Sequence, residues 1–140
     1  MPSRQRALYK KRAIPADLGT EAKAAKMDIE TLRSYLLARP GAEETYPFDA
    51  ETLAVKVGGR IFALLMPGDG PAWLNLKCLP EHAEILRELY PAVLPGYHMN
   101  KRHWNTVVLD GTLPDADLEG MIDESYRLVV AGLPRSRRPG

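Results

Sequence analysis

The chain has 140 residues, of which 45% are hydrophobic and 26% charged, and its formal net charge is +1. This length favours one compact domain, and the composition excludes a disordered or fibrous protein. The longest apolar run, residues 61–66, is too short to cross a membrane, and we recognise no export signal in residues 1–27. A single cysteine excludes an intramolecular disulfide. We therefore expect a single-domain cytoplasmic protein without a membrane partner.

Charge is distributed unevenly along this chain. Residues 1–27 carry seven Lys and Arg against two acids, a balance of +5, and residues 133–140 carry three Arg and no acid. Residues 28–132 carry nine cations and sixteen acids, a balance of −7. We predict a basic extension at 1–27, a folded domain at 28–133 and a basic tail at 134–140. Basic termini attract nucleic acid by releasing its counterions; the alternative is that both ends only keep the chain soluble.

The first predicted helix begins after Asp28, a favourable N-cap residue, and its apolar positions recur at helical spacing up to Leu37. It ends before Pro40, which cannot continue the helical hydrogen bonds. Residues 43–48 are ambiguous and could form a short edge strand.

The clearest local pattern is a β-hairpin. Two strand-like runs, 53–57 and 60–66, are separated by Gly58-Gly59, and both turn residues of a tight hairpin need a positive φ. The second run is apolar on both faces, which favours an interior strand. A further strand is predicted at 72–77, after a turn at 67–71.

A second helix is predicted from Pro80, with Ala83, Ile85, Leu86 and Leu89 on its apolar side, although Leu79 is a poor N-cap. A loop at 91–103, a strand at 104–109 and a turn at Asp110-Gly111 follow. The last helix starts near Asp115, and its apolar stripe runs from Leu118 to Val130. The order predicts an α+β fold, with an antiparallel sheet and helices packed mainly on one face.

The densest group of polar side chains lies between Tyr97 and Trp104. As a nucleic-acid contact, its cations would meet phosphates, its amide or imidazole would meet a base edge, and Trp104 or Tyr97 would stack on a base. As a catalytic site, His98 or His103 would act as a general base, with Lys101 stabilising an anion. The structural alternative is that Trp104 fills the core while His103 and Asn100 hold the loop backbone.

Other chemistry has less support in the sequence. A metal site at His98 and His103 would need a third ligand, such as His82 or a distant carboxylate. Ser125 and Cys78 stand outside any nucleophile motif. We predict no catalytic residues, no metal and no cofactor.

The predicted sheet offers a second binding surface. If Val55 and Val57 face the helices, Lys56 points the other way, and Trp73, Asn75 and Lys77 could join it on an outer face suited to single strands. The alternative is an ordinary solvated face covered by long side chains.

Several strings resemble the MmcQ/YjbR family: residues 56–65 (KVGGRIFALL), 95–106 (PGYHMNKRHWNT) and 109–111 (LDG). Leu76-Lys77 with Pro80-Glu81, residues 113–115 and Ser125-Tyr126 also match, so that the resemblance runs from about Met27 to Leu133. It implies a CyaY-like, double-wing α+β fold and the family's description as DNA-binding protein. Leu79 departs from the polar cap usual at its position.

These observations favour a small non-enzymatic nucleic-acid-binding protein with DNA as the expected partner. The predicted contacts are a cationic loop and sheet face: Lys56, Lys77, His98, Asn100, Lys101, Arg102, His103 and Trp104. The alternative function is a protein- or small-ligand-interaction module that uses the loop from Tyr97 to Trp104 and binds no nucleic acid. The oligomeric state stays open.

Overall fold

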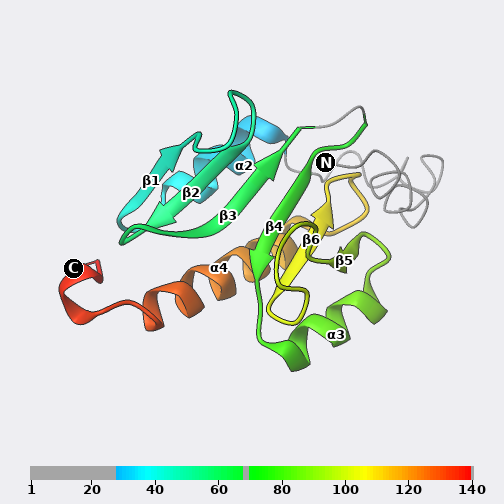
Figure 1. Cartoon of the computed structure of the whole chain (residues 1–140). Coiled ribbons are helices and arrows are strands. Elements are labelled where there is room, and N and C mark those ends of the chain that lie inside the picture. The colour runs from blue at the N-terminus through cyan, green and yellow to red at the C-terminus, as the bar shows by residue number, and fades with distance from the viewer. Residues whose placement is uncertain (1–27, 68–69, 140) are drawn as a thin grey trace.

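A six-stranded sheet with the strand order β1-β2-β3-β4-β6-β5 forms the centre of the molecule, and every neighbouring pair is antiparallel (Figure 1). The computed structural model describes residues 28–67 and 70–139. The strands are β1 Ala42–Thr45, β2 Leu53–Val57, β3 Arg60–Met66, β4 Trp73–Lys77, β5 Val93–Pro95 and β6 Trp104–Val108. The predicted basic extension at 1–27 lies outside the described residues.

The helices in the described part are α2 Ile29–Leu37, α3 Pro80–Leu89, α4 Asp115–Ala131 and a 3-10 turn, η3, at Arg135–Arg137. As predicted, Asp28 caps α2: its carboxylate accepts a 2.7 Å hydrogen bond from the Thr31 amide. Gly58 and Gly59, with φ of 59° and 86°, form the predicted tight turn between β2 and β3. The α+β fold predicted from the sequence is therefore confirmed.

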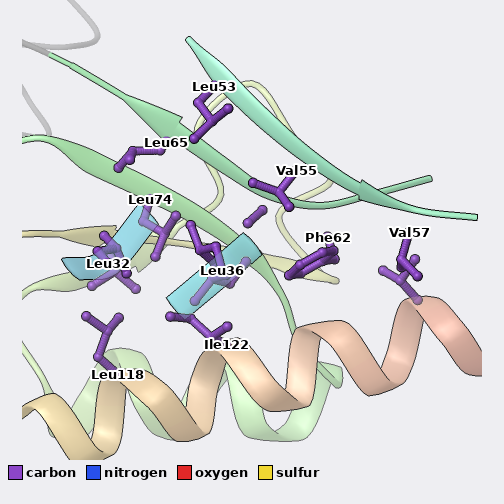
Figure 2. Packing of buried hydrophobic residues seen from close by; sticks show 14 of the residues in the cluster. Leu32, Leu36, Leu53, Val55, Val57, Phe62, Leu65, Leu74, Leu118 and Ile122 are labelled. Carbon is purple, nitrogen blue, oxygen red and sulfur yellow. The ribbon is translucent and has the colours of Figure 1, made fainter. Parts of the chain in front are cut away.

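The main core lies between the sheet and the helices. Leu32 and Leu36 of α2 and Leu118 and Ile122 of α4 are buried against the side chains of the sheet, and Figure 2 shows the two α4 residues pointing toward it. We call this side of the sheet the helix face. α3 also packs here, at the β5–β6 edge, where the Asn105 side chain donates a hydrogen bond to the Ala83 carbonyl.

The opposite side, which we call the open face, has a smaller core of its own. Trp73 and Tyr97 meet edge to face, with ring centroids 5.2 Å apart, and Leu94, Ala92 and Val108 pack beside them. The loop after β5 thus covers the end of this face nearest the β5 edge. The candidate functional site lies over the remainder of the open face.

Three details differ from the sequence prediction. The segment 91–103 is not all loop, because β5 pairs with β6 there. The short edge strand considered for residues 43–48 is present as β1, but it covers only Ala42–Thr45 and the rest of the segment is an exposed loop. On α3, Ile85 and Leu89 are 52% and 64% exposed, because only the side that carries Ala83 and Leu86 reaches the sheet.

None of the helices formed by residues 28–67 and 70–139 has the length and apolar character that a bilayer crossing requires.

Candidate functional site

A pocket of about 620 Å³ lies over the open face, between the loop after β1 and the loop after β5. The first loop contributes Phe48, Asp49, Glu51 and Thr52. Strand side chains and the second loop supply the rest of the lining: Leu64, Met66, Pro67, Asn75, Tyr97, His98 and Met99. We call this the open-face pocket. The lining that the described residues form combines apolar side chains with two carboxylates and one imidazole, and contains neither Lys nor Arg.

The acidic side of the pocket is organised by Asp49. Its carboxylate accepts hydrogen bonds from the amides of Glu51 and Thr52, at 2.8 and 2.6 Å, and from the Thr52 hydroxyl at 3.1 Å. The bonds from Thr52 and then Glu51 lower the pKa of the Asp49 carboxyl further below its ordinary range, because they stabilise the ionised form. Both carboxylates are exposed, and Phe48 beside them is 65% exposed.

Buried hydrogen bonds hold the second loop against the sheet. The Asn75 side chain, 1% exposed, donates to the Tyr97 carbonyl at 2.9 Å. The Thr106 hydroxyl donates to the Asn75 amide oxygen and accepts from the Tyr97 amide, at 2.5 and 2.8 Å. The backbone at Tyr97 is thereby fixed from both sides, which positions the next two residues at the pocket.

His98 lies at the pocket with an unusual backbone. Its φ is 61°, in the left-handed region, and no other non-glycine residue of the described chain has a positive φ. Its exposed ring lies 4.2 Å from that of Tyr97, measured between centroids. A left-handed non-glycine residue is strained, and such residues concentrate at functional sites.

The rest of the predicted loop site is largely occupied by internal contacts. The Lys101 ammonium donates to the Gly96 carbonyl at 2.9 Å, and the Asn100 side chain accepts from the Arg102 amide at 2.9 Å. The His103 carbonyl accepts from the Cys78 amide, and its own amide donates to the Asn100 carbonyl. The Asn100 side chain thus holds the loop backbone as in the structural alternative, whereas His103 does so only through its own backbone and the half-buried Trp104 belongs to neither core cluster.

The predicted cations lie in two different places, the open face of the sheet and a groove on α3. Lys56 and Lys77 lie on the open face near the carboxyl ends of β2 and β4, about 10 Å apart since one strand separates them. The half-buried Trp104 is paired with Lys77 on that face. Arg102 instead lines a groove on α3 that contains three glutamates, Glu81, Glu84 and Glu88.

The outer-face prediction is wrong for two of its members. Trp73 and Asn75 do point to the open face, but both are 1% exposed, because the loop after β5 covers them. They cannot stack on or bind a nucleic-acid strand. Of that predicted set, Lys56 and Lys77 stay accessible, each half-buried.

Arg87 of α3 is a structural residue that the sequence analysis missed. Its guanidinium donates to the Asn105 side chain at 2.7 Å, to the Trp104 carbonyl at 3.3 Å and to the Lys101 carbonyl. The helix is thus connected to the start of β6 and to the loop before it. A basic residue on an otherwise exposed helical turn gave no signal of this role.

The isolated nucleophile candidates have structural partners. The buried Ser125 hydroxyl donates to the Phe62 carbonyl at 2.6 Å and accepts from the Lys77 amide at 2.8 Å, so that it joins α4 to two strands. Cys78 is 5% exposed, and burial, followed by the Glu124 carboxylate, raises the pKa of its thiol to about 12. Such a thiol is a poor nucleophile at neutral pH.

The histidines do not gather around a common centre. His82 contacts the Glu124 carboxylate at 3.0 Å on the helix side, far along the chain from His98 and His103. Throughout residues 28–67 and 70–139, no group of three His, Cys, Asp or Glu side chains is arranged to hold a metal ion.

Comparison with known proteins assigns a family to this fold. The family model described as YjbR matches residues 37–128, about two thirds of the chain, including both sides of the open-face pocket. The chain belongs to the YjbR family. This confirms the resemblance carried by the hairpin and by residues 95–106.

Curated relatives and solved structures support the same assignment. The chain is 39% identical over 112 residues to the uncharacterized protein YjbR of Escherichia coli K12, covering 80% of this chain and 95% of that protein. It is 38% identical over 106 residues to YbdF of Escherichia coli O157:H7, covering 76% and 87%. A crystal structure of the Deinococcus radiodurans protein DR2400 has a TM-score of 0.74 and 41% identity, covering 81% of this chain and 86% of that one.

The first half of the pocket lining was not found from sequence. Phe48 ends the ambiguous segment 43–48, and Asp49 and Glu51 follow it in a stretch for which no strand or helix was predicted. The available signal was local: an Asp followed three positions later by Thr is typical of a turn closed by the Asp side chain. Nothing in that signal indicated that the turn faces His98, about fifty positions later in the chain.

Proposed function

We propose that this YjbR-family protein is a non-enzymatic binding module that holds a small organic molecule in the open-face pocket. The observation that carries the proposal is the pocket itself, about 620 Å³ in volume and lined from two loops and two strands. Ligand pockets of proteins occupy roughly 300–1,000 Å³ and are lined mostly by apolar groups with a few polar ones. This proposal develops the alternative function predicted from the sequence.

The fixed second loop supports binding. Asn75 and Thr106 bond to the Tyr97 backbone at 2.9 and 2.8 Å and to each other at 2.5 Å, so one wall of the pocket is formed before any ligand arrives. A preformed wall reduces the conformational entropy that binding must remove.

Binding without turnover fits the arrangement of the titratable groups. A general base needs a partner that orients it and a reacting group within hydrogen-bond reach. Within the described pocket, the Asp49 carboxylate is already held by its own turn, and no hydrogen bond connects His98 to Asp49 or Glu51. We therefore assign these side chains to recognition.

A fragment titration followed by two-dimensional amide NMR tests this function. We expect some members of a library of ring-containing cations, neutral molecules and anions, at millimolar concentration, to shift the amides of residues 48–52 and 96–99. Amides of α3 and η3 serve as internal controls because neither element lines the pocket. A library that shifts no amide around the pocket would contradict the proposal.

DNA binding is a second candidate function, supported by one observation. Lys56, Lys77 and the half-buried Trp104 share one end of the open face, which is the combination of cation and aromatic that single strands contact. The basic extension at 1–27 and the arginines after residue 134 would add attraction.

A fluorescence-anisotropy titration with labelled single-stranded and duplex DNA tests this second candidate. Binding should weaken steeply between about 50 and 200 mM salt, because each neutralised phosphate releases counterions. The double variant Lys56→Gln/Lys77→Gln should weaken it, whereas Arg127→Gln on α4 should matter less. Absence of binding at low salt would exclude DNA as a partner.

A further inference from the structure

We infer that the ligand of the open-face pocket is an organic cation, an ammonium group attached to a compact apolar or aromatic body. This inference rests on the proposed small-molecule binding and specifies the chemistry of the ligand. It follows from three features of the lining: its negative charge, the hydrogen bonds that hold the Asp49 carboxylate in place, and the aromatic and thioether side chains beside the two acids.

The charge of the lining is one-sided. Asp49 and Glu51 both line the pocket, and among residues 28–67 and 70–139 neither a Lys nor an Arg does. Residues 28–132 add to this field with sixteen acids against nine cations, and the positive charge of the chain is concentrated in residues 1–27 and 133–140. Within the described part of the lining, an anionic ligand would meet two carboxylates and no ammonium or guanidinium group.

The acidic side of the pocket is held in place before a ligand binds. Two backbone amides and the Thr52 hydroxyl donate to Asp49, which orients its carboxylate and favours its ionised form. Glu51, two positions later, makes no hydrogen bond or ion pair through its side chain with any other described residue. Its carboxylate is therefore available to an incoming ammonium group.

The apolar part of the lining suits a cation with an apolar body. The ring of Phe48 is 65% exposed beside the two acids, and aromatic faces attract ammonium groups. Met66 and Met99 line the same pocket, and their flexible, polarisable thioethers adapt to varied ligand shapes. Leu64 completes an apolar floor on β3.

Three probes of similar shape and different charge test the inference. We would titrate phenethylammonium, 2-phenylethanol and phenylacetate into the full chain and follow the amides of residues 48–52 and 96–99 by NMR. At low salt, phenethylammonium should bind at least about five-fold more tightly than 2-phenylethanol, from one ammonium–carboxylate pair and one cation–aromatic contact. Phenylacetate should bind most weakly, and added salt should reduce the differences.

Two matched variants test whether the preference for the cationic probe comes from the pocket. Glu51→Gln keeps the size of the side chain. It should reduce the ratio of the affinities for phenethylammonium and 2-phenylethanol by about two-fold or more. Glu84→Gln removes an equally exposed carboxylate from the α3 groove and should leave that ratio unchanged. Equal effects of both variants would show that the preference comes from overall charge, which would overturn the assignment.

The outcomes separate this inference from the proposed function. If 2-phenylethanol or phenylacetate shifts the pocket amides at least as readily as phenethylammonium, the pocket binds small molecules but the cation inference is wrong. If these three probes and the wider fragment library all leave the pocket amides unchanged, the proposed function fails and the inference fails with it.

Discussion

His98 shows how a single residue can be placed by its surroundings against its own preference. Its φ of 61° is a conformation that Asn tolerates better than most side chains and that β-branched residues avoid. The buried bonds from Asn75 and Thr106 to the preceding residue hold the chain there. The strained position puts an exposed imidazole at the pocket, a result that residue type alone did not predict.

Two substitutions at His98 separate backbone strain from loss of the ring. Both His98→Asn and His98→Val remove the contact with Tyr97, but only valine is poorly tolerated at this φ. We expect His98→Val to lower the free energy of unfolding by about 1–2 kcal/mol relative to His98→Asn. Urea denaturation measures this difference, and equal midpoints would show that the loop relaxes without strain.

Cys78 predicts a pH dependence of stability. Its thiol has a pKa of about 12 in the folded protein against an ordinary value of 9.0, because of burial and then the Glu124 carboxylate. Below about pH 9 both states keep the proton; between about pH 9 and 12 only the unfolded state loses it, so stability falls as the pH rises.

The Cys78→Ala variant lacks this contribution. Its melting temperature should therefore fall less than that of the original chain between about pH 8 and pH 11. Tyr35, Tyr90 and Tyr126, whose pKa values are also raised, titrate in both proteins and cancel in the comparison. Parallel melting curves across this pH range would show that the thiol does not contribute.

At the scale of elements, the sequence predicted the β2–β3 hairpin most clearly, because a Gly-Gly turn between two apolar runs is a local signal. The capped start of α2 was equally local in origin, since Asp28 bonds to the Thr31 amide three residues later. β5 was missed because three residues that end in a proline carry no strand periodicity, and its pairing with β6 depends on residues ten to fourteen positions later. The width of the apolar side of α3 was overestimated for a related reason: a helix at the edge of a sheet buries a narrower stripe of residues than a helix that crosses the face of the sheet.

The two glycines of the hairpin turn supply a matched test. Both have positive φ, so alanine is strained at either position, by about 1 kcal/mol. At Gly58 a Cβ would also lie 2.5 Å from Leu133 Cδ1 and 2.8 Å from the Arg137 carbonyl, whereas nothing lies within 4 Å at Gly59.

We therefore expect Gly58→Ala to cost about 1–3 kcal/mol more stability than Gly59→Ala, because it displaces the segment after α4 from the hairpin. Thermal unfolding of the two variants measures the difference. Similar losses would mean that the segment at Leu133–Arg137 moves away freely.

At the scale of the whole molecule, the loop that forms one wall of the pocket depends on contacts from both sides of the sheet. Asn75 and Thr106 hold it from the open face, and Arg87 of α3 holds its end at Lys101 and Trp104. The helix at the β5–β6 edge is thus coupled to the pocket on the opposite face.

Arg87→Met keeps much of the aliphatic stem and removes the three hydrogen bonds. We expect the free energy of unfolding to fall by about 2–3 kcal/mol, since the Lys101 carbonyl and the Asn105 side-chain oxygen lose a charged donor, while the Trp104 carbonyl keeps its bond from the Gly96 amide. Amide hydrogen exchange should accelerate in residues 96–104 but not in β2 or β3. The exposed Arg127→Met on α4 is the control, and unchanged exchange in the loop would contradict the coupling.

The sequence by itself determined the α+β class, the central hairpin, the helix starts and the family, because each depends on residues close together in the chain. It also identified residues 97–104 as the densest polar segment. Only the tertiary structure decided what that segment does: Lys101 and Asn100 bond within the loop, Arg102 faces the acids of α3, and His98 faces a pocket. The physical reason is that a pocket requires side chains from segments about fifty residues apart, and their meeting depends on strand order and buried hydrogen bonds rather than on local pattern.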